Sequence, residues 1–167
     1  MLKLSHLAIC VILFIVWGCH DEGIDPDNYA KAKKDGQDWK AQVVVKYSDR
    51  FGDSSLNIIL YTPNEINPRE SLGFFHVPLK ENLYHVKDGI TIWDTLDILG
   101  AFNPIKNEFP YVIYHPDDHI DNKFIIESFD MVTNEMIISF EGTFVTPSPL
   151  PFNQVVFTEG EIRTKIK

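Results

Sequence analysis

Alternation of apolar and polar residues with a period of two is the feature that most constrains the fold of this chain. The alternation begins near Trp39 and is clear in residues 42–47 and 56–61, which are rich in valine and isoleucine. Such a pattern is typical of β-strands with one face in a core, and β-branched side chains favour the same conformation. We therefore expect two strands here, joined as a hairpin through the turn-forming residues 48–54.

Further strand-like segments follow, separated by turn-forming residues. We expect strands in residues 72–79, 83–86, 89–100, 111–114, 123–129, 135–145 and 154–166. Segment 83–86 is expected to be a partner of 72–79. Segment 89–100 also fits a helical stripe, and its threonine and isoleucine content favours a strand. Many short strands without a long helix predict an all-β fold, either an antiparallel β-sandwich or a flattened lipocalin-like barrel.

The N-terminal segment has the three parts of an export signal. Lys3 gives a short basic region, residues 7–17 form an apolar core, and Gly18 is a small residue directly before Cys19. A transmembrane helix needs about 20 apolar residues, so this core is too short to cross a bilayer. The sequence predicts a signal rather than a membrane span.

The run Val16-Trp17-Gly18-Cys19 resembles the processing site of bacterial lipoproteins, although small residues are common where Trp17 stands. The resemblance implies a diacylglyceryl group on the thiol of Cys19, cleavage before this residue, and usually an acylated new amino terminus. Each buried methylene contributes about 0.8 kcal/mol, so two or three acyl chains form a stable anchor. The alternative is a plain secretory signal or a buried N-terminal helix in which Cys19 is an ordinary thiol.

The acidic stretch after Cys19 sets the expected organisation. Residues 20–23 resemble the acidic tetrads of surface-exported lipoproteins in Bacteroidota-type envelopes, and a solvated tether explains them equally well. We expect a signal peptide at residues 1–18, a lipidated cysteine with an acidic, flexible tether at 19–34, and one all-β domain at 35–167. The expected location is the outer membrane of a bacterial envelope, with the periplasmic and the cell-surface face both open.

Size and charge limit the possible functions. Removing 18 of the 167 residues leaves 149, the size of one domain, and the loss of Lys3 changes the net charge from −9 to −10. An acidic chain is a poor partner for nucleic acid, and the basic run Lys31, Lys33 and Lys34 is expected to be a solvated face. With Cys10 removed and Cys19 lipidated, the domain would have no disulfide.

Three further stretches resemble small uncharacterised lipoproteins of Bacteroidota-type envelopes with a single all-β domain. They are residues 35–41, residues 124–130 followed by 133–134, and residues 139–144 with a closing 157–161. The resemblance implies a fold and an envelope address, and it supplies no activity or catalytic residues. The residues themselves have structural roles: Asp35-Gly36 suits a tight turn, Trp39 can plug one end of the core, and Gly142 suits a bulge or a close strand approach.

The strongest candidate for chemistry is the segment His115, Asp117 and His119, whose imidazoles and carboxylate are ligands that zinc accepts. Pro116 between strand-like flanks argues for a loop, so an Asp- and His-rich turn is the preferred interpretation. Asp25, Asp27 and Asn28 lack the pattern of a calcium loop and are expected to belong to the tether. His76 and His85 are expected to be packed or surface residues, and no cofactor is expected.

No known catalytic motif is present in the sequence. We therefore expect a lipid-anchored, non-catalytic binding or accessory module, whose partner is a glycan, an envelope protein or a small apolar ligand. The membrane is the other expected partner, through acyl chains on Cys19. Two alternatives are a metal- or carboxylate-dependent envelope hydrolase and a purely structural lipoprotein.

Overall fold

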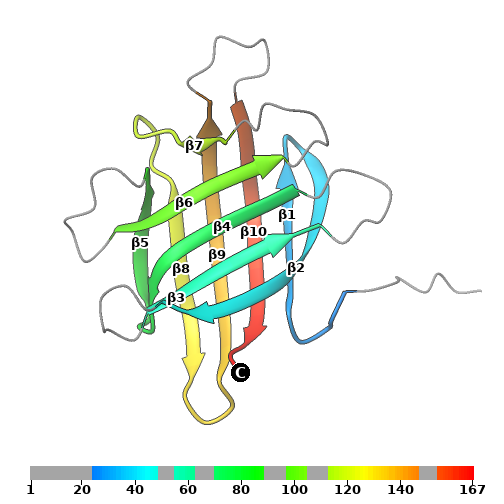
Figure 1. Ribbon diagram of the computed structural model, residues 1–167, viewed down its shortest axis with the longest axis vertical. Helices are drawn as coiled ribbons and strands as arrows, with labels where there is room; N and C mark the ends of the chain where they lie inside the picture. Colours follow the sequence, from blue (N-terminus) through cyan, green and yellow to red (C-terminus); the bar gives the residue numbers. More distant parts are fainter. Residues whose placement is uncertain (1–23, 49–54, 63–69, 89–96, 105–112, 147–153) are drawn as a thin grey trace, which may run out of the picture.

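The computed structural model describes residues 24–48, 55–62, 70–88, 97–104, 113–146 and 154–167. Ten strands are found in these ranges (Figure 1). They are β1 (Tyr29–Lys34), β2 (Gln37–Tyr47), β3 (Ser55–Tyr61), β4 (Glu70–Pro78), β5 (Asn82–Lys87), β6 (Asp97–Pro104), β7 (His115–Pro116), β8 (Lys123–Asp130), β9 (Glu135–Val145) and β10 (Gln154–Lys165).

Nine of these strands form a closed barrel. Their order is β10-β1-β2-β3-β4-β6-β5-β8-β9, and pairing of β9 with β10 closes the ring. The predicted all-β class is confirmed, and of the two predicted architectures the structure has the barrel. Closure gives every one of the nine strands two neighbours, which removes the exposed sheet edges that an open sandwich would leave.

The barrel begins earlier in the chain than the sequence predicted. Tyr29–Lys34 form β1 between β10 and β2, so these residues belong to the barrel and not to a tether that ends at residue 34. The turn after β1 is the predicted one, because Asp35 and Gly36 have φ angles of 50° and 78° and connect the paired residues Lys34 and Gln37. Positive φ at both positions is the conformation of a type I′ hairpin.

The insertion of β6 between β4 and β5 departs from the predicted topology. Segment 83–86 lies in β5 but pairs with β6 and β8 rather than with β4. The β5–β6 pair is parallel, and the other ladders are antiparallel. Of the ambiguous segment 89–100, residues 97–100 are in a strand, and 89–96 lie outside the described residues.

The barrel interior is filled by aromatic and aliphatic side chains. Phe157 of β10 is completely buried, and its ring centroid lies 5.2 Å from Trp39, 5.4 Å from Phe102 and 5.9 Å from Phe144. Phe140 continues the cluster toward Phe74 at 5.3 Å. Offset and edge-to-face contacts of this kind add to the hydrophobic stabilisation of the core. The alternation seen in the sequence therefore places its apolar face in the interior.

Trp39 lies near the upper end of the barrel, the end in Figure 1 that is defined by Lys34, Lys123 and Gln154. Its indole nitrogen donates to Glu70 Oε2 at 3.1 Å, and the Lys34 ammonium binds the other oxygen of this carboxylate. Trp39 is buried, in agreement with its predicted role as a plug at one end of the core.

A bulge in β10 explains one glycine. Between Phe157 and Gly160 the register shifts against β9, and Glu159 has a φ of 52°. A Cβ atom on Gly160 would lie 2.5 Å from the carbonyl oxygen of Phe140, so only glycine fits this approach of the two strands. The extra residue of the bulge is therefore in β10, and Gly142, predicted to suit a bulge or a close strand approach, is the partner of Phe157 at the edge of this register shift.

The lower end of the barrel is defined by Tyr29, the 131–134 turn and Lys165, and there Asn28 joins the first and last strands (Figure 1). Asn28 Oδ1 accepts hydrogen bonds from Thr164 Oγ1 and from the Lys165 backbone amide, both at 2.9 Å, and its Nδ2 donates to Asp25 Oδ2 at 2.9 Å. Asn28 is 8% exposed, so it is an element of the fold rather than part of a solvated tether.

We expect Asn28→Ala to lower the free energy of unfolding by about 1–3 kcal/mol, because the buried Thr164 hydroxyl loses its acceptor. Guanidinium unfolding followed by tryptophan fluorescence measures the change. Asn82→Ala is the matched control, since the Asn82 side chain is exposed and accepts from the neighbouring Leu83 amide, and we expect a change within about 0.5 kcal/mol. Equal effects of the two substitutions would contradict the role of Asn28.

Candidate binding pocket

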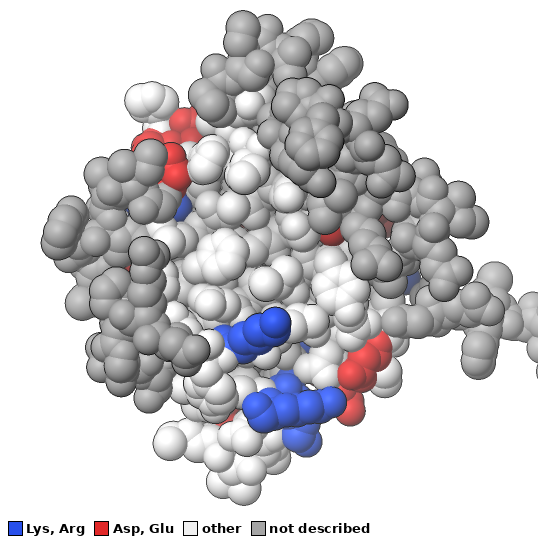
Figure 2. Space-filling view, in the orientation of Figure 1, with Lys and Arg blue, Asp and Glu red and all other residues white. Residues whose placement is uncertain are grey.

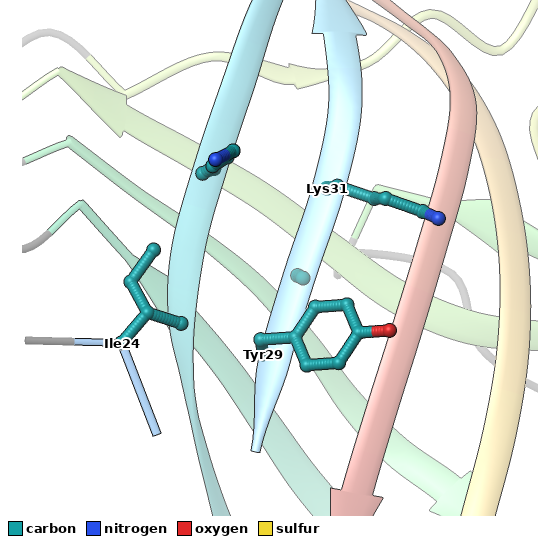
Figure 3. A pocket seen from close by; sticks show the side chains of 5 residues that line it. Ile24, Tyr29 and Lys31 are labelled. Atoms are coloured by element: carbon teal, nitrogen blue, oxygen red, sulfur yellow. The ribbon is translucent and has the colours of Figure 1, made fainter. Parts of the chain in front are cut away.

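A pocket of 250 Å³ lies on the outer wall of the barrel near its lower end (Figure 3). It is lined by Ile24 from the N-terminal segment, by Tyr29, Ala30 and Lys31 from β1, and by Lys40 from β2. Figure 3 shows the Tyr29 ring and the Lys31 side chain extending from the same strand in the direction of β10. The pocket thus offers an aromatic surface beside amino groups.

The period-two alternation of β1 puts the Tyr29 and Lys31 side chains on the outer face of the strand. Ala30 and Ala32 are buried in the core, so Tyr29 and Lys31 alternate with them and lie on the outer surface. Lys40 is the direct cross-strand partner of Lys31. Register between β1 and β2 therefore assembles the pocket, and the Asp35-Gly36 turn sets that register.

The N-terminal segment is held against this wall by hydrogen bonds. The Asp25 amide donates to Gln42 Oε1 at 3.0 Å, and Gln42 Nε2 donates to the Asn28 carbonyl oxygen at 2.9 Å. Hydrogen bonds from Asn28 Nδ2 and the Asp27 amide stabilise the Asp25 carboxylate and lower its pKa. These contacts fix the segment that carries Ile24, so one side of the pocket is formed before any ligand arrives.

The charges beside the pocket are predominantly positive. Glu161 of β10 binds Arg163 Nε at 2.7 Å and Lys31 Nζ at 3.0 Å, and the Tyr29 hydroxyl lies 3.5 Å from its Oε1. The hydrogen bonds from Arg163 and then Lys31 lower the pKa of Glu161. Two cations, Lys31 and Arg163, thus share one carboxylate beside the pocket, in a chain whose net charge is −9. This local excess favours an anionic group as ligand.

The residues predicted as weak metal ligands are not brought together. His115 Nδ1 lies 2.9 Å from Asp88 Oδ1, and Asp117 Oδ1 accepts from the backbone amide of His119 at 3.0 Å. Within the described part of the chain, no three His, Cys, Asp or Glu side chains form a group that would hold a metal ion. The segment is a turn whose polar side chains bind the backbone and neighbouring residues.

Asn122 is the residue that shapes this turn, and sequence analysis did not single it out in this role. Its Oδ1 accepts from the Thr143 amide at 2.7 Å, and its Nδ2 donates to the Asp117 carbonyl at 2.9 Å. Asn122 is 2% exposed. Segment 114–116 then crosses the upper end of the barrel, because Tyr114 pairs with Phe102 of β6 and β7 pairs with β9.

His76 and His85, two further histidines of the described residues, have structural partners. His76 has a φ of 61° at a bulge in β4, and its Nδ1 lies 3.1 Å from Ser48 Oγ. His85 Nδ1 lies 2.9 Å from Asp121 Oδ1. The sequence also offers two carboxylate pairs of the kind that a glycosidase would need, Asp94 with Asp97 and Glu159 with Glu161. Glu161 is engaged by cations as described above, and Asp94 lies outside the described residues.

No protein-family model, curated protein or solved structure matches this chain. In the ranges that the structure describes, no helix is long and apolar enough to span a membrane.

Proposed function

We propose that this chain is a lipid-anchored cell-envelope protein that acts as a non-catalytic binding module, and that the pocket beside Tyr29 binds its ligand. The observation that carries this proposal is the combination of an aromatic ring, two lysines and a fixed N-terminal segment in one outer-wall pocket. Binding sites typically combine such an apolar surface with a few well-placed polar groups.

The packing of the barrel supports the outer wall as the binding surface. A small apolar ligand would need space in the interior, where Phe74, Phe102 and Phe157 are each at most 1% exposed and pack against one another or against other core aromatics. Displacing these rings would forfeit core contacts throughout the barrel. Among the ligands expected from the sequence, this favours one that binds at the surface.

A glycan with an acidic group fits the chemistry of the pocket. The flat face of Tyr29 can cover the apolar face of a sugar ring, and the Lys31 ammonium, which shares Glu161 with Arg163, can bind a carboxylate of the ligand. A tyrosine also loses little conformational entropy on binding, since it has two side-chain torsions. We therefore propose acidic oligosaccharides as the ligand class.

Tyr29→Ala is expected to weaken the binding of a galacturonic acid oligosaccharide about tenfold, equivalent to about 1.4 kcal/mol. Isothermal titration calorimetry of the detergent-solubilised mature protein measures this. Tyr47→Ala is the control, because Tyr47 is 58% exposed at the far end of β2 and does not line the pocket. A neutral oligosaccharide of equal length should bind more weakly than the acidic one. If neither sugar binds, or if the two variants behave alike, the proposal fails.

A further inference from the structure

The turn between β8 and β9 projects an apolar tip from the lower end of the barrel (Figure 1). Met131 is 81% exposed and Val132 is 92% exposed, the highest values among the large apolar residues that the structure describes as exposed. Ile137, on the outer face of β9 close to the tip, is 36% exposed. Single exposed apolar residues are ordinary, whereas two adjacent ones on a projecting turn form a surface that water solvates poorly.

The tip has a fixed shape. Asp130 Oδ1 accepts hydrogen bonds from the Val132 amide at 2.7 Å and from the Thr133 amide at 3.2 Å, and Asn134 adopts a φ of 59°. The Ile166 amide then donates to the Asn134 carbonyl oxygen at 2.9 Å, which ties the turn to the end of β10. Because the backbone is held from both sides, Met131 and Val132 stay extended toward the solvent.

The same end of the barrel receives the N-terminal segment. Asn28 binds Thr164 and Lys165, and Lys165 is the cross-strand partner of Glu135, the first residue after the turn. The 131–134 turn lies further down the barrel than Tyr29. Tyr29 is level with Arg163 of β10, whereas Glu135, the residue next to the turn, is level with Lys165, two residues further along β10. In Figure 1 the described chain begins beside the barrel wall and descends to the start of β1, and the tip projects below that point.

The length of the preceding segment limits how far this end can lie from an anchor at Cys19. Ile24 is held at the outer wall, and five residue steps separate it from Cys19. A fully extended chain covers at most about 3.6 Å per residue, which gives about 18 Å. A lipid on Cys19 would thus keep Ile24, on the outer wall near the lower end of the barrel, within this distance of the membrane surface.

The charges near the tip suit an anionic bilayer. Arg163, Lys165 and Lys167 lie on the last strand and its end, and Lys165 Nζ is 3.6 Å from Glu135 Oε1. In Figure 2, Lys and Arg atoms lie just above the white lower end of the molecule. Arg163 and Lys165 can exchange their carboxylate partners, Glu161 and Glu135, for anionic headgroups, as basic side chains behind an apolar tip do in peripheral proteins.

We propose that the tip formed by Met131 and Val132 is a membrane-contact site, which inserts into the headgroup region of the bilayer that holds Cys19. The inference rests on the proposed lipid anchor, because the anchor supplies the proximity that makes a weak contact effective. With the anchor and the tip both engaged, the barrel stands on its lower end. The 131–134 turn then faces the lipid, and the upper end with Trp39 faces away from it.

Site-specific labelling tests this orientation, because the mature chain has no cysteine other than the lipidated Cys19. Val132→Cys and, as a matched control, Ile120→Cys are labelled with an environment-sensitive nitrobenzoxadiazole dye. Ile120 is 42% exposed and lies before β8, at the opposite end of the strand from the tip. The lipidated protein is reconstituted into vesicles of phosphatidylethanolamine and phosphatidylglycerol that contain a spin-labelled quencher lipid.

We expect the label at position 132 to be quenched at least threefold more than the label at position 120. Equal quenching would overturn the proposal, as would a label at 132 that is shielded only when other envelope proteins are added. Mass spectrometry of the N-terminal peptide separates this outcome from failure of the anchor. If acyl chains are absent, the same variants are attached through an N-terminal hexahistidine tag to a nickel-chelating lipid, and the comparison is repeated.

Discussion

Cys19→Ser is expected to abolish acylation of the protein completely. Serine lacks the thiol that receives the diacylglyceryl group in the lipoproteins that this N-terminus resembles, and without this group their peptidase does not cut. The precursor should therefore accumulate with its first 18 residues attached. Metabolic labelling with a radioactive fatty acid, together with the intact mass of the protein, measures both effects.

Cys10→Ser provides the control for this experiment, because Cys10 lies inside the apolar segment and would be removed with it if the predicted cleavage occurs. We expect this variant to be acylated and processed like the parent chain. Retention of fatty-acid label in Cys19→Ser would contradict the anchor, and so would equal behaviour of the two variants. Trp17→Ala extends the test, since a small residue at that position matches the lipoprotein pattern better and should speed processing.

Phe157→Ala should lower the free energy of unfolding by about 3–5 kcal/mol, the range for removing a large buried aromatic side chain. Phe157 is 0% exposed and lies among Trp39, Phe102 and Phe144, so its loss would leave a cavity that these rings cannot fill without leaving their own contacts. Chemical unfolding of the purified domain, followed by fluorescence and circular dichroism, gives the change.

Val156→Ala is the control for Phe157→Ala, because Val156 precedes it in β10 and points to the other face, where it is partly exposed. The loss should remain below about 1 kcal/mol. A destabilisation by Phe157→Ala that is no larger than that of Val156→Ala would show that the ring cluster does not form as described.

The strands of this protein were predictable because their signals are local. Segments 135–145 and 154–166 match β9 and β10 almost residue for residue, since each is rich in β-branched and aromatic residues and is bounded by turn-forming residues. The Asp35-Gly36 turn was predictable for the same reason, because both residues tolerate the positive φ angles that a type I′ turn requires.

The order of the strands was not predictable, because it depends on contacts between distant segments. Two strands that follow each other in the chain usually pair as a hairpin, so β5 was expected beside β4. Nothing in residues 83–86 shows that β6 lies between these two strands. Segment 29–34 carries three lysines, which suggested a solvated tether, but Lys31 and Lys33 lie on the outer surface while Ala30 and Ala32 enter the core. Alanine has a low preference for strands and little apolar surface, so Ala30 and Ala32 did not produce a recognisable apolar–polar alternation for β1.

The candidate pocket shows the same limit. Tyr29, Lys31 and Lys40 form no motif, and only the register of β1 against β2 brings them together. In the segment from His115 to His119, residues that are close in sequence have different partners. His115 lies beside Asp88, whereas the Asp117 carboxylate accepts a hydrogen bond from the His119 backbone amide. Spacing along the chain is a guide to a site only where the local backbone is regular.

The pairing of β1 with β10 has a consequence for how the protein is made. Tyr29 lies opposite Arg163, 134 residues further along the chain, so β1 has no partner on that side until the last strand has been synthesised. Before then β1 and β9 each expose a free edge that can pair with another copy of the chain. Any interruption of synthesis before residue 154 would leave such a sheet open, and these fragments are the species from which aggregates would grow.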